Sequence, residues 1–473
     1  MTIGLEIHAE LKTATKMFCR CKNNPDEERP NWNICPVCTA QPGTLPVINH
    51  KAVEHVLRVG TALGSTLADF TEWDRKNYFY PDIPKGYQIS QYKYPLVSGG
   101  NLAGVDITRI HLEEDTGSSR HDKGDYSLVD YNRAGVPLME LVTEPVIHDA
   151  ETAMRFAKEL QLLLRYLGAS DANMEKGEMR VEANISISET ETFGTKVEVK
   201  NINSFKSVGD AIAYEIKRHA EVLSRGEKIV QETRGWDESA GKTFSQRKKE
   251  SANDYRYFPE PDLPKMKISE IPEFQNLKAT MPELPWERRA RLSKEFSFPD
   301  FITEMLVTDE VIGGFFATVA SELVGDPTAS DALAGKELIK LASNYLTSDL
   351  ASLMKAGDGT LSMVTPTNFI GLIRMVHAGD VSSRGAKDTL ALLYREGGDA
   401  KAVAEKNGLI QKSDMGALEA IVTEVIATNE KVVAEYKGGK VALLQFFVGQ
   451  GMKASKGSAN PQFLGELFRK SLD

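Results

Sequence analysis

The segment Ile3-Gly-Leu-Glu-Ile-His-Ala-Glu-Leu11 indicates how the first part of the chain folds. Its odd-numbered positions are all aliphatic, whereas its even-numbered positions include Glu6 and His8. Side chains on a β-strand alternate between two faces, so this pattern predicts a strand with one core face and one polar face. Met179–Ser188 and Lys196–Lys200 alternate in the same way. Such strands are typical of an antiparallel sheet with one face packed on the core and one face exposed to solvent.

Two kinds of sequence pattern divide the chain. Residues 1–290 combine alternation with frequent Pro and Gly, and they have helical spacing only near 149–167 and 207–225. Beyond 290, apolar residues recur at i, i+3 and i+4 within 303–324, 331–345, 381–395, 414–436 and 440–454. We therefore predict an α+β protein with a mainly antiparallel-sheet domain over 1–290, an all-helical domain over 291–400 and a small helical tail domain over 401–473. A chain of 473 residues is also too long for one core, which stops growing at roughly 250 to 300 residues.

The charge of the chain limits its partners. The net charge is −10, which argues against a nonspecific nucleic-acid binder, although local charge matters more than the sum. Only residues 431–473 are basic, with 7 Lys and Arg against 3 Asp and Glu. No apolar run approaches the ~18 residues of a membrane helix, and the first residues do not resemble a signal peptide. We expect a cytoplasmic protein with neither a membrane nor DNA as a partner.

Acidic side chains gather in and near the predicted strands. Residues 101–150 hold 10 acids and 4 bases, including Glu113 and Glu114, and Glu140 stands between apolar residues. If these strands share one sheet, the acids converge with Glu6 and His8, and such oxygen-rich ligands suit magnesium bound to nucleotide phosphates. The alternative is a solvated polar face with ordinary ion pairs. Neither a P-loop motif nor a protein-kinase signature is present, so any use of a nucleotide requires an unusual magnesium-centred site.

All four cysteines lie in one short segment, with the spacing C-x-C-x13-C-x2-C over 19–38. Close pairs joined by a Pro-rich loop match structural zinc, which is bound by the thiolates of Cys19, Cys21, Cys35 and Cys38. Disulfides are the alternative, but nothing in the sequence indicates an oxidising compartment. If all four thiolates bind zinc, none remains as a nucleophile to release ammonia from glutamine.

Several longer segments are more specific than any pattern. They are Gly4-Leu-Glu-Ile-His8, Tyr80-Pro-Asp-Ile-Pro-Lys-Gly-Tyr-Gln-Ile-Ser-Gln91, His111-Leu-Glu-Glu-Asp-Thr-Gly117, Asp130-Tyr-Asn-Arg-Ala-Gly-Val-Pro-Leu-Met-Glu140, Gly177-Glu-Met-Arg-Val-Glu-Ala-Asn184, Val199-Lys-Asn-Ile-Asn-Ser-Phe205 and Tyr255-Arg-Tyr-Phe-Pro-Glu-Pro-Asp262. In this order and at this spacing they resemble the B subunits of the bacterial tRNA-dependent amidotransferases. The final segment, Gln450 to Pro461 with the helix after it, is similar to the small YqeY-like helical domain that closes this family.

The resemblance implies a fold and a reaction. The fold is a glutamine-synthetase-like cradle followed by helical domains. The reaction is ATP-dependent phosphorylation of the side-chain carboxylate of Glu-tRNA(Gln) or Asp-tRNA(Asn), and ammonia then displaces the phosphate. The carboxylate must first become an acyl phosphate, because oxide is a poor leaving group when ammonia attacks. In phosphoryl transfer the protein contributes mainly positioning and charge neutralisation. The implied partners are a glutaminase (A) subunit and a small C subunit in a heterotrimer. ATP and magnesium are the implied cofactors, beside structural zinc. The sequence does not distinguish Gln-tRNA from Asn-tRNA as the cellular product.

The resemblance also assigns residues. The implied magnesium ligands, direct or through water, are Glu6, His8, Glu113, Glu114 and Glu140. Residues implied in catalysis or in holding phosphate or the aminoacyl end are Arg180, Glu182, Asn184, Lys200, Asn201, Asn203 and Ser204, for which supporting structural roles are the alternative. Lys85, Tyr87 and Gln88 either line this site or only shape a loop. The Tyr255–Asp262 segment is diagnostic of the family but suggests no mechanism by itself.

The basic tail suggests contact with tRNA. Its candidate residues are Lys437, Lys440, Lys453 and Lys456, which would meet phosphates without reading bases. The alternative is a solvated basic helix. For the whole chain, the leading hypothesis is the ATP-dependent amidotransferase subunit. A noncatalytic tRNA-binding scaffold is the second hypothesis, and a self-sufficient glutamine amidotransferase is a third, disfavoured by the lack of a spare thiol.

Overall fold

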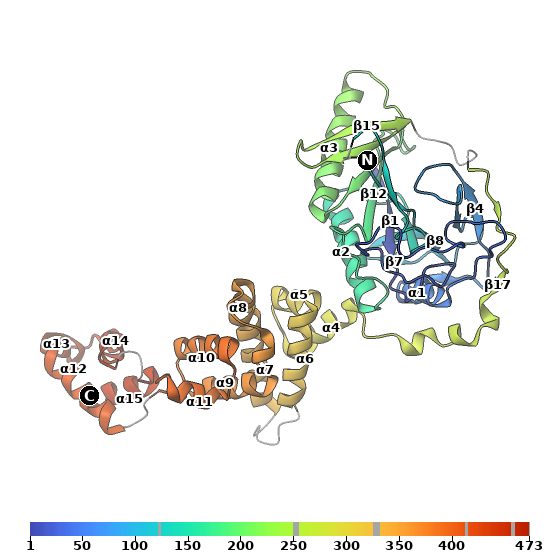
Figure 1. Cartoon of the computed structure of the whole chain (residues 1–473). Helices are drawn as coiled ribbons and strands as arrows, with labels where there is room; N and C mark the ends of the chain where they lie inside the picture. The colour runs from blue at the N-terminus through green and yellow to red at the C-terminus, as the bar shows by residue number, and fades with distance from the viewer. Residues whose placement is uncertain (122–123, 249–254, 325–331, 412–414, 456–458, 473) are drawn as a thin grey trace. The chain divides into compact units, whose positions relative to one another are not determined.

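The computed structural model describes residues 1–473 except 122–123, 249–254, 325–331, 412–414, 456–458 and 473 (Figure 1). The chain forms two compact units, Met1–Pro285 and Trp286–Asp473. The first unit combines strands and helices, whereas the described residues of the second contain helices and no named strand. The predicted α+β class is therefore confirmed.

One large sheet organises the first unit. Its order is β15-β14-β13-β12-β1-β11-β8-β6-β2, and β7 pairs with β8 off this path. The bounds are β1 Thr2–Glu10, β2 Thr66–Leu67, β6 Val97–Ser98, β7 Asn101–Leu102, β8 Val105–Glu114, β11 Pro137–Thr143, β12 Met179–Ser186, β13 Val197–Ile202, β14 Glu232–Asp237 and β15 Lys242–Lys248. Within the described sheet, neighbouring strands are antiparallel except for the pair β13 and β14.

The apolar face of this sheet is the core of the first unit. Ile3, Leu5 and Ile7 of β1 are completely buried, as the alternation predicts. Helices α2 (Ala150–Tyr166) and α3 (Phe205–Ser224) pack against each other, and α3 also packs against β12, β13 and β15 (Figure 1). Both helices lie close to the ranges that the sequence predicts. They pack on the apolar side of the sheet, opposite the face that carries Glu6 and His8.

Helix α1 (His50–Ala62) is not predicted by the apolar spacing, although it packs against β8. Its buried positions include Val53, Val56 and Val59, and β-branched residues have lower helix propensity than Ala or Leu. Two features favour the helix in the folded chain. Asn49 caps it by accepting a hydrogen bond from the Lys51 amide at 3.0 Å, and burial of the valines outweighs their weak propensity.

Smaller sheets complete the first unit. The strands β16 (Phe258–Pro259), β4 (Asp74–Asn77) and β5 (Tyr87–Ser90) pair in that order, and β5 packs against β8. The other short strands are β3 Phe70–Thr71, β9 Ser118–Arg120, β10 Leu128–Asp130 and β17 Met266–Lys267. The β16-β4-β5 sheet is important for the site, because Lys76 and Tyr78 line the same cavity as the polar face of the large sheet.

The second unit is a succession of helices. They are α4 Pro285–Phe296, α5 Asp300–Thr308, α6 Glu310–Val324, α7 Ala332–Asn344, α8 Ala351–Ala356, α9 Pro366–Ala378, α10 Ser383–Glu396, α11 Ala400–Lys406, α12 Met415–Thr428, α13 Glu430–Lys437, α14 Leu444–Ala454 and α15 Pro461–Leu472. A π-helical turn, Tyr345–Leu350, joins α7 to α8. Helix α11 packs on α9 and α10, whereas Leu418, Phe447 and Phe468 belong to a separate core shared by α12 to α15. Among the described helices, none is both long and apolar enough to cross a membrane.

Candidate functional site

The register of the large sheet aligns four polar residues in one row. Arg180 of β12 lies opposite His8 of β1, and His8 lies opposite Glu140 of β11. Glu140 in turn lies opposite His111 of β8. Residues directly opposite each other on neighbouring strands point to the same face. The alternation in each strand therefore produces a continuous polar row, which the sequence predicts only strand by strand.

His8 stands at the centre of this row. Its Nε2 lies 3.4 Å from Oε2 of Glu140, 3.9 Å from Oε1 of Glu113 and 3.9 Å from Oε1 of Glu6. Two groups of side chains have ligand atoms within 4.8 Å of one another: His8 with Glu113 and Glu140, and His8 with Glu6 and Glu182. The structure thus brings together four of the five residues that the resemblance assigns to magnesium.

His111 also belongs to this cluster, although it is absent from the ligands predicted from the sequence. Its Nε2 lies 3.3 Å from Oε2 of Glu140 and 3.8 Å from Oε2 of Glu113. The sequence contains a pattern that could have indicated His111 as a ligand, because His111 and Glu113 are two residues apart in β8, just as Glu6 and His8 are in β1. Ser90 of β5 donates a hydrogen bond of 2.9 Å to the same oxygen of Glu113 and so orients that carboxylate.

Burial and the excess of acids perturb the protonation of this cluster. Burial raises the pKa of Glu6 to about 7, and the charges of Glu140 and Glu182 act in the same direction. Burial alone would lower the pKa of His8, but its interactions with Glu140, Glu182 and Glu6 outweigh burial and raise that pKa to about 9. Burial would raise the pKa of Glu140, but its interactions with His111 and His8 together outweigh burial and hold that pKa well below its ordinary value. Titratable groups this strongly perturbed are a common feature of functional sites.

A cavity of about 280 Å³ opens above these residues. Its lining includes the cations Lys76, Arg180 and Lys200. Arg180 Nη2 lies 3.0 Å from Oδ2 of Asp115, and Lys200 Nζ lies 2.7 Å from Oε2 of Glu182. Acids that can hold a metal ion and cations that can hold phosphate therefore share one cavity.

Lys76 is a second site residue that is absent from the residues predicted from the sequence. Burial would lower its pKa, but the charges of Glu113 and its neighbours raise the pKa above the ordinary value, so the side chain stays an ammonium. No local pattern could reveal this lysine, because it faces the acids only after the β16-β4-β5 sheet has folded beside the large sheet.

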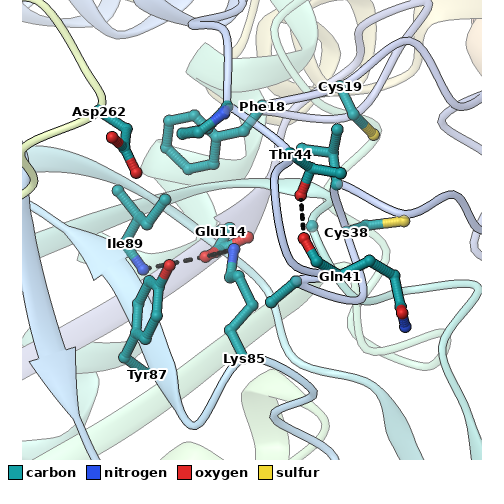
Figure 2. Close-up of a pocket in the computed structure, with 14 residues that line it drawn as sticks. Phe18, Cys19, Cys38, Gln41, Thr44, Lys85, Tyr87, Ile89, Glu114 and Asp262 are labelled. Atoms are coloured by element: carbon teal, nitrogen blue, oxygen red, sulfur yellow. Dashed lines mark hydrogen bonds and ion pairs between the residues drawn. The ribbon is translucent and has the colours of Figure 1, made fainter.

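Glu114 lies apart from the row of ligands. Its alternation in β8 directs it away from Glu113, and its carboxylate forms a buried ion pair with Lys85 (Figure 2). The same carboxylate accepts a hydrogen bond of 2.9 Å from the amide of Ile89, while Gln88 Nε2 donates one of 2.6 Å to the Glu114 carbonyl. Lys85, Tyr87 and Glu114 line a second cavity beside the cysteine segment. Gln88 also lines the first cavity.

The remaining residues assigned to ATP or the aminoacyl end occupy different positions. Asn184 lies on β12 opposite Gly4, and its buried Oδ1 accepts no hydrogen bond from the described residues. Asn201 and Asn203 are exposed, and the backbone of Asn201 adopts a left-handed φ of 61°. Ser204 caps α3, because its Oγ accepts a hydrogen bond of 3.0 Å from the amide of Ser207.

The four cysteines converge as the spacing predicts. All four are free thiols, and their sulfur atoms lie within 4.8 Å of one another, which makes the group able to hold a metal ion. The amide of Cys35 donates a hydrogen bond of 3.0 Å to Sγ of Cys38. A hydrogen bond from the Cys19 thiol, aided by the charge of Lys16, lowers the pKa of Cys38 to about 5. Cys38 is therefore the thiol of this cluster that most readily becomes a thiolate, the form that binds a metal ion.

The basic residues of the tail lie in the second unit. Lys437 ends α13, Lys453 lies in the last turn of α14, and both are exposed. Lys440 is also exposed and pairs with Glu435 at 2.9 Å. Lys456 lies outside the described residues. Phe447 is completely buried in the core of α12 to α15, so Lys437, Lys440 and Lys453 are exposed residues of a folded helical module.

Comparison with known proteins identifies the family. Residues 1–272 match the family model described as the GatB/GatE catalytic domain, and residues 330–472 match the one described as the GatB domain. A relative from Dehalococcoides mccartyi (strain CBDB1), named as the B subunit of aspartyl/glutamyl-tRNA(Asn/Gln) amidotransferase, is 44% identical over 490 residues, covering 100% of this chain and 98% of its own. A protein of the same name from Picosynechococcus sp. is 42% identical over 496 residues, covering 99% of this chain and 97% of its own. The chain belongs to the family of aspartyl/glutamyl-tRNA(Asn/Gln) amidotransferase B subunits.

Proposed function

We propose that this chain uses ATP to activate the side-chain carboxylate of Glu-tRNA(Gln) or Asp-tRNA(Asn) in the cavity above His8, so that ammonia can amidate it. Membership of the B-subunit family supports the transamidation function and disfavours the purely structural scaffold. We assign the reaction to this cavity because it brings together possible metal ligands and cations. The ligands are His8, Glu113 and Glu140, and the cations are Lys76, Arg180 and Lys200.

The donor set of the cavity fits magnesium. His8, Glu113 and Glu140 would hold the ion, and Glu6 and Glu182 form a second group of possible ligands with His8. The carboxylates around His8 raise its pKa against the effect of burial, and those around Glu6 add to the effect of burial, so a divalent cation would relieve the negative charge of this cluster. Magnesium, when bound, neutralises phosphate charge and orients the phosphates.

The protein's own groups have separate tasks in the proposed reaction. An oxygen of the substrate carboxylate attacks the γ-phosphorus of ATP, the bond from that phosphorus to the bridging oxygen breaks, and ADP leaves. Arg180 and Lys200 would contact phosphate or aminoacyl oxygens, and their ion pairs with Asp115 and Glu182 would hold them in position. Ammonia then attacks the acyl carbon and inorganic phosphate departs. Asn184, Asn201 and Asn203 remain candidates for contacts with ATP or the aminoacyl end.

Partners and domains complete the proposal. Because all four cysteines belong to one cluster, ammonia would come from a glutaminase subunit, in a heterotrimer with a small C subunit. We assign zinc to that cluster because four thiolates close a tetrahedral structural site. The cradle over 1–290 would catalyse both steps of the reaction. The helical domain over 291–400 would connect it to the tail over 401–473, whose lysines would contact tRNA. We expect the complex to act in the cytoplasm.

The decisive experiment measures ATP turnover by the reconstituted complex with and without misacylated tRNA. The variant Glu6→Ala/Glu140→Ala should lose tRNA-stimulated ATP hydrolysis and amidation, while Glu175→Gln, at an exposed acid of the same unit, should behave as wild type. Wild-type rates in the double variant would refute the magnesium-site assignment. A scaffold without catalysis predicts that neither variant changes ATP turnover.

A further inference from the structure

The Tyr255–Asp262 segment has a definite place in the structure. Its strand β16 pairs with β4, so that Phe258 lies opposite Arg75. Arg75 donates two hydrogen bonds to the buried carboxylate of Glu260, at 2.7 and 2.8 Å. The amide of Glu260 also donates to the carbonyl of Trp73 at 2.8 Å. A forked pair of this kind fixes direction as well as distance, so the segment is held firmly along β4.

The beginning of the same segment places two tyrosine rings beside Lys76. Asn77 Nδ2 donates hydrogen bonds to the carbonyls of Tyr255 and Arg256, at 3.2 and 2.9 Å. The ring of Tyr257 stacks on Tyr92, with centroids 4.3 Å apart and planes 9° apart. The ring of Tyr255 makes edge contacts with Tyr257 at 6.0 Å and with Tyr78 at 5.8 Å. The rings therefore support one another.

The Lys76 ammonium lies against these rings and lines the cavity of His8. Its Nζ is 5.2 Å from the centroid of Tyr255 and 5.7 Å from that of Tyr78, which are cation–π distances. Arg180 and Lys200 each pair with a carboxylate, but among the described residues no carboxylate oxygen lies within 4.0 Å of Lys76 Nζ. Lys76 thus presents a positive charge to the cavity, near enough to Glu113 to feel its charge but in no ion pair among the described residues.

We propose that Lys76 is a catalytic residue whose ammonium contacts the oxygens of the phosphoryl group during its transfer, and that Tyr255 and Tyr78 position this ammonium. The inference rests on the proposed function. The oxygens of the transferred group carry negative charge throughout the step, while the carboxylate–phosphorus bond forms and the bond to ADP breaks. A cation that is already positioned in a partly desolvated site stabilises this charge, because neither the side chain nor the surrounding solvent has to reorganise during the step. The Tyr255–Asp262 segment would serve the reaction by holding the rings against Lys76.

The test compares Lys76→Met, Lys76→Arg and Lys93→Met in the reconstituted complex. Lys93 is a matched control, because it is an exposed lysine that lies 5.0 Å from the Tyr94 ring centroid and does not line the cavity. Loss of a single charge-stabilising donor lowers kcat by about 100-fold or more. We expect this loss of tRNA-stimulated ATP hydrolysis in Lys76→Met, with tRNA affinity within twofold of wild type. Lys76→Arg should recover part of the rate, and Lys93→Met should retain all of it.

The positioning role has its own readout. Tyr255→Phe keeps the ring and should keep kcat, whereas Tyr255→Leu should lower kcat without an equal change in the KM for ATP. Equal kcat values for Tyr255→Leu and wild type would overturn the positioning role. A kcat for Lys76→Met within twofold of wild type, or a defect confined to tRNA affinity, would overturn the catalytic role. These results require a wild-type complex that hydrolyses ATP, so a wild type without tRNA-stimulated hydrolysis would instead contradict the proposed function.

Discussion

His8 and Glu140 lie opposite each other on neighbouring strands, and Nε2 of the imidazole is 3.4 Å from Oε2 of the carboxylate. The same oxygen is 3.3 Å from Nε2 of His111, so one carboxylate is shared by two imidazoles. Without a bound cation, protons on the imidazoles balance the acids. This contact therefore links protonation of the cluster to the binding of any metal ion.

The first prediction concerns the competition between protons and magnesium. The pKa of His8 is raised to about 9, so the imidazole is protonated at pH 7 in the metal-free protein and must lose its proton before it can bind a metal. We expect magnesium affinity, measured by calorimetry, to increase as the pH rises from 7 to 9. In Glu140→Gln the NMR titration of His8 should move to lower pH. An affinity independent of pH would exclude His8 as a direct ligand.

The second prediction concerns acid stability. Glu215 of α3 is completely buried, and the contact with His219 Nε2 at 3.2 Å together with hydrogen bonds from Arg218 and Thr243 outweighs burial to lower its pKa to about 2. A carboxylate whose pKa is lower in the folded than in the unfolded state stabilises the protein above the unfolded pKa. That contribution is lost as the pH falls towards the folded pKa, here between about 4.5 and 2.

Glu215→Gln should therefore destabilise the first unit by about 3 kcal/mol at neutral pH, because it leaves buried cations without their anion. The difference from wild type should shrink as the pH falls below 4.5 in denaturant unfolding experiments. Glu221→Gln, at an exposed position of the same helix, is the control. A difference that stays constant down to pH 2 would contradict the assigned pKa shift.

The third prediction concerns the cysteine cluster. Metal analysis of the purified protein should find about one zinc per chain, as expected for one site with four thiolates. Cys38→Ser should lose the metal and destabilise the first unit, because the segment around the cluster has little core of its own. A metal-free preparation with unchanged unfolding and activity would refute structural zinc.

The fourth prediction concerns the buried ion pair between Lys85 and Glu114. Lys85→Met leaves a buried carboxylate without its cation and should cost about 3 kcal/mol of unfolding free energy. Adding Glu114→Gln removes that charge, so the double variant should regain much of the lost stability. Additive losses in this double-mutant cycle would indicate that the two side chains act independently.

The fifth prediction concerns tRNA binding by the tail. Lys437→Glu/Lys453→Glu should weaken the affinity of the complex for tRNA and flatten its dependence on salt, because fewer phosphate contacts are formed. Lys355→Glu, in α8, is a control from the other part of the helical unit. Unchanged tRNA affinity in the tail variant would leave the tail as a solvated basic surface.

Local patterns were sufficient for several parts of the site. Alternation in β1, β12 and β13 predicts which residues share a strand face, because the period of two is a property of the backbone. The spacing of the cysteines likewise predicts their convergence, since nearby pairs need only one loop to meet. The spacing does not predict α1, whose valines are stabilised as a helix by contacts with distant strands.

The amphipathic strands, the cysteine cluster and, through the ordered segments, the family follow from the amino-acid order alone. That His111 joins the ligand row, that Glu114 pairs with Lys85 in another cavity, and that Lys76 faces the acids became visible only in the folded chain. Strand register and the packing of one sheet beside another depend on contacts between residues far apart in the chain. A local pattern therefore says which way a side chain points but not which partner it meets.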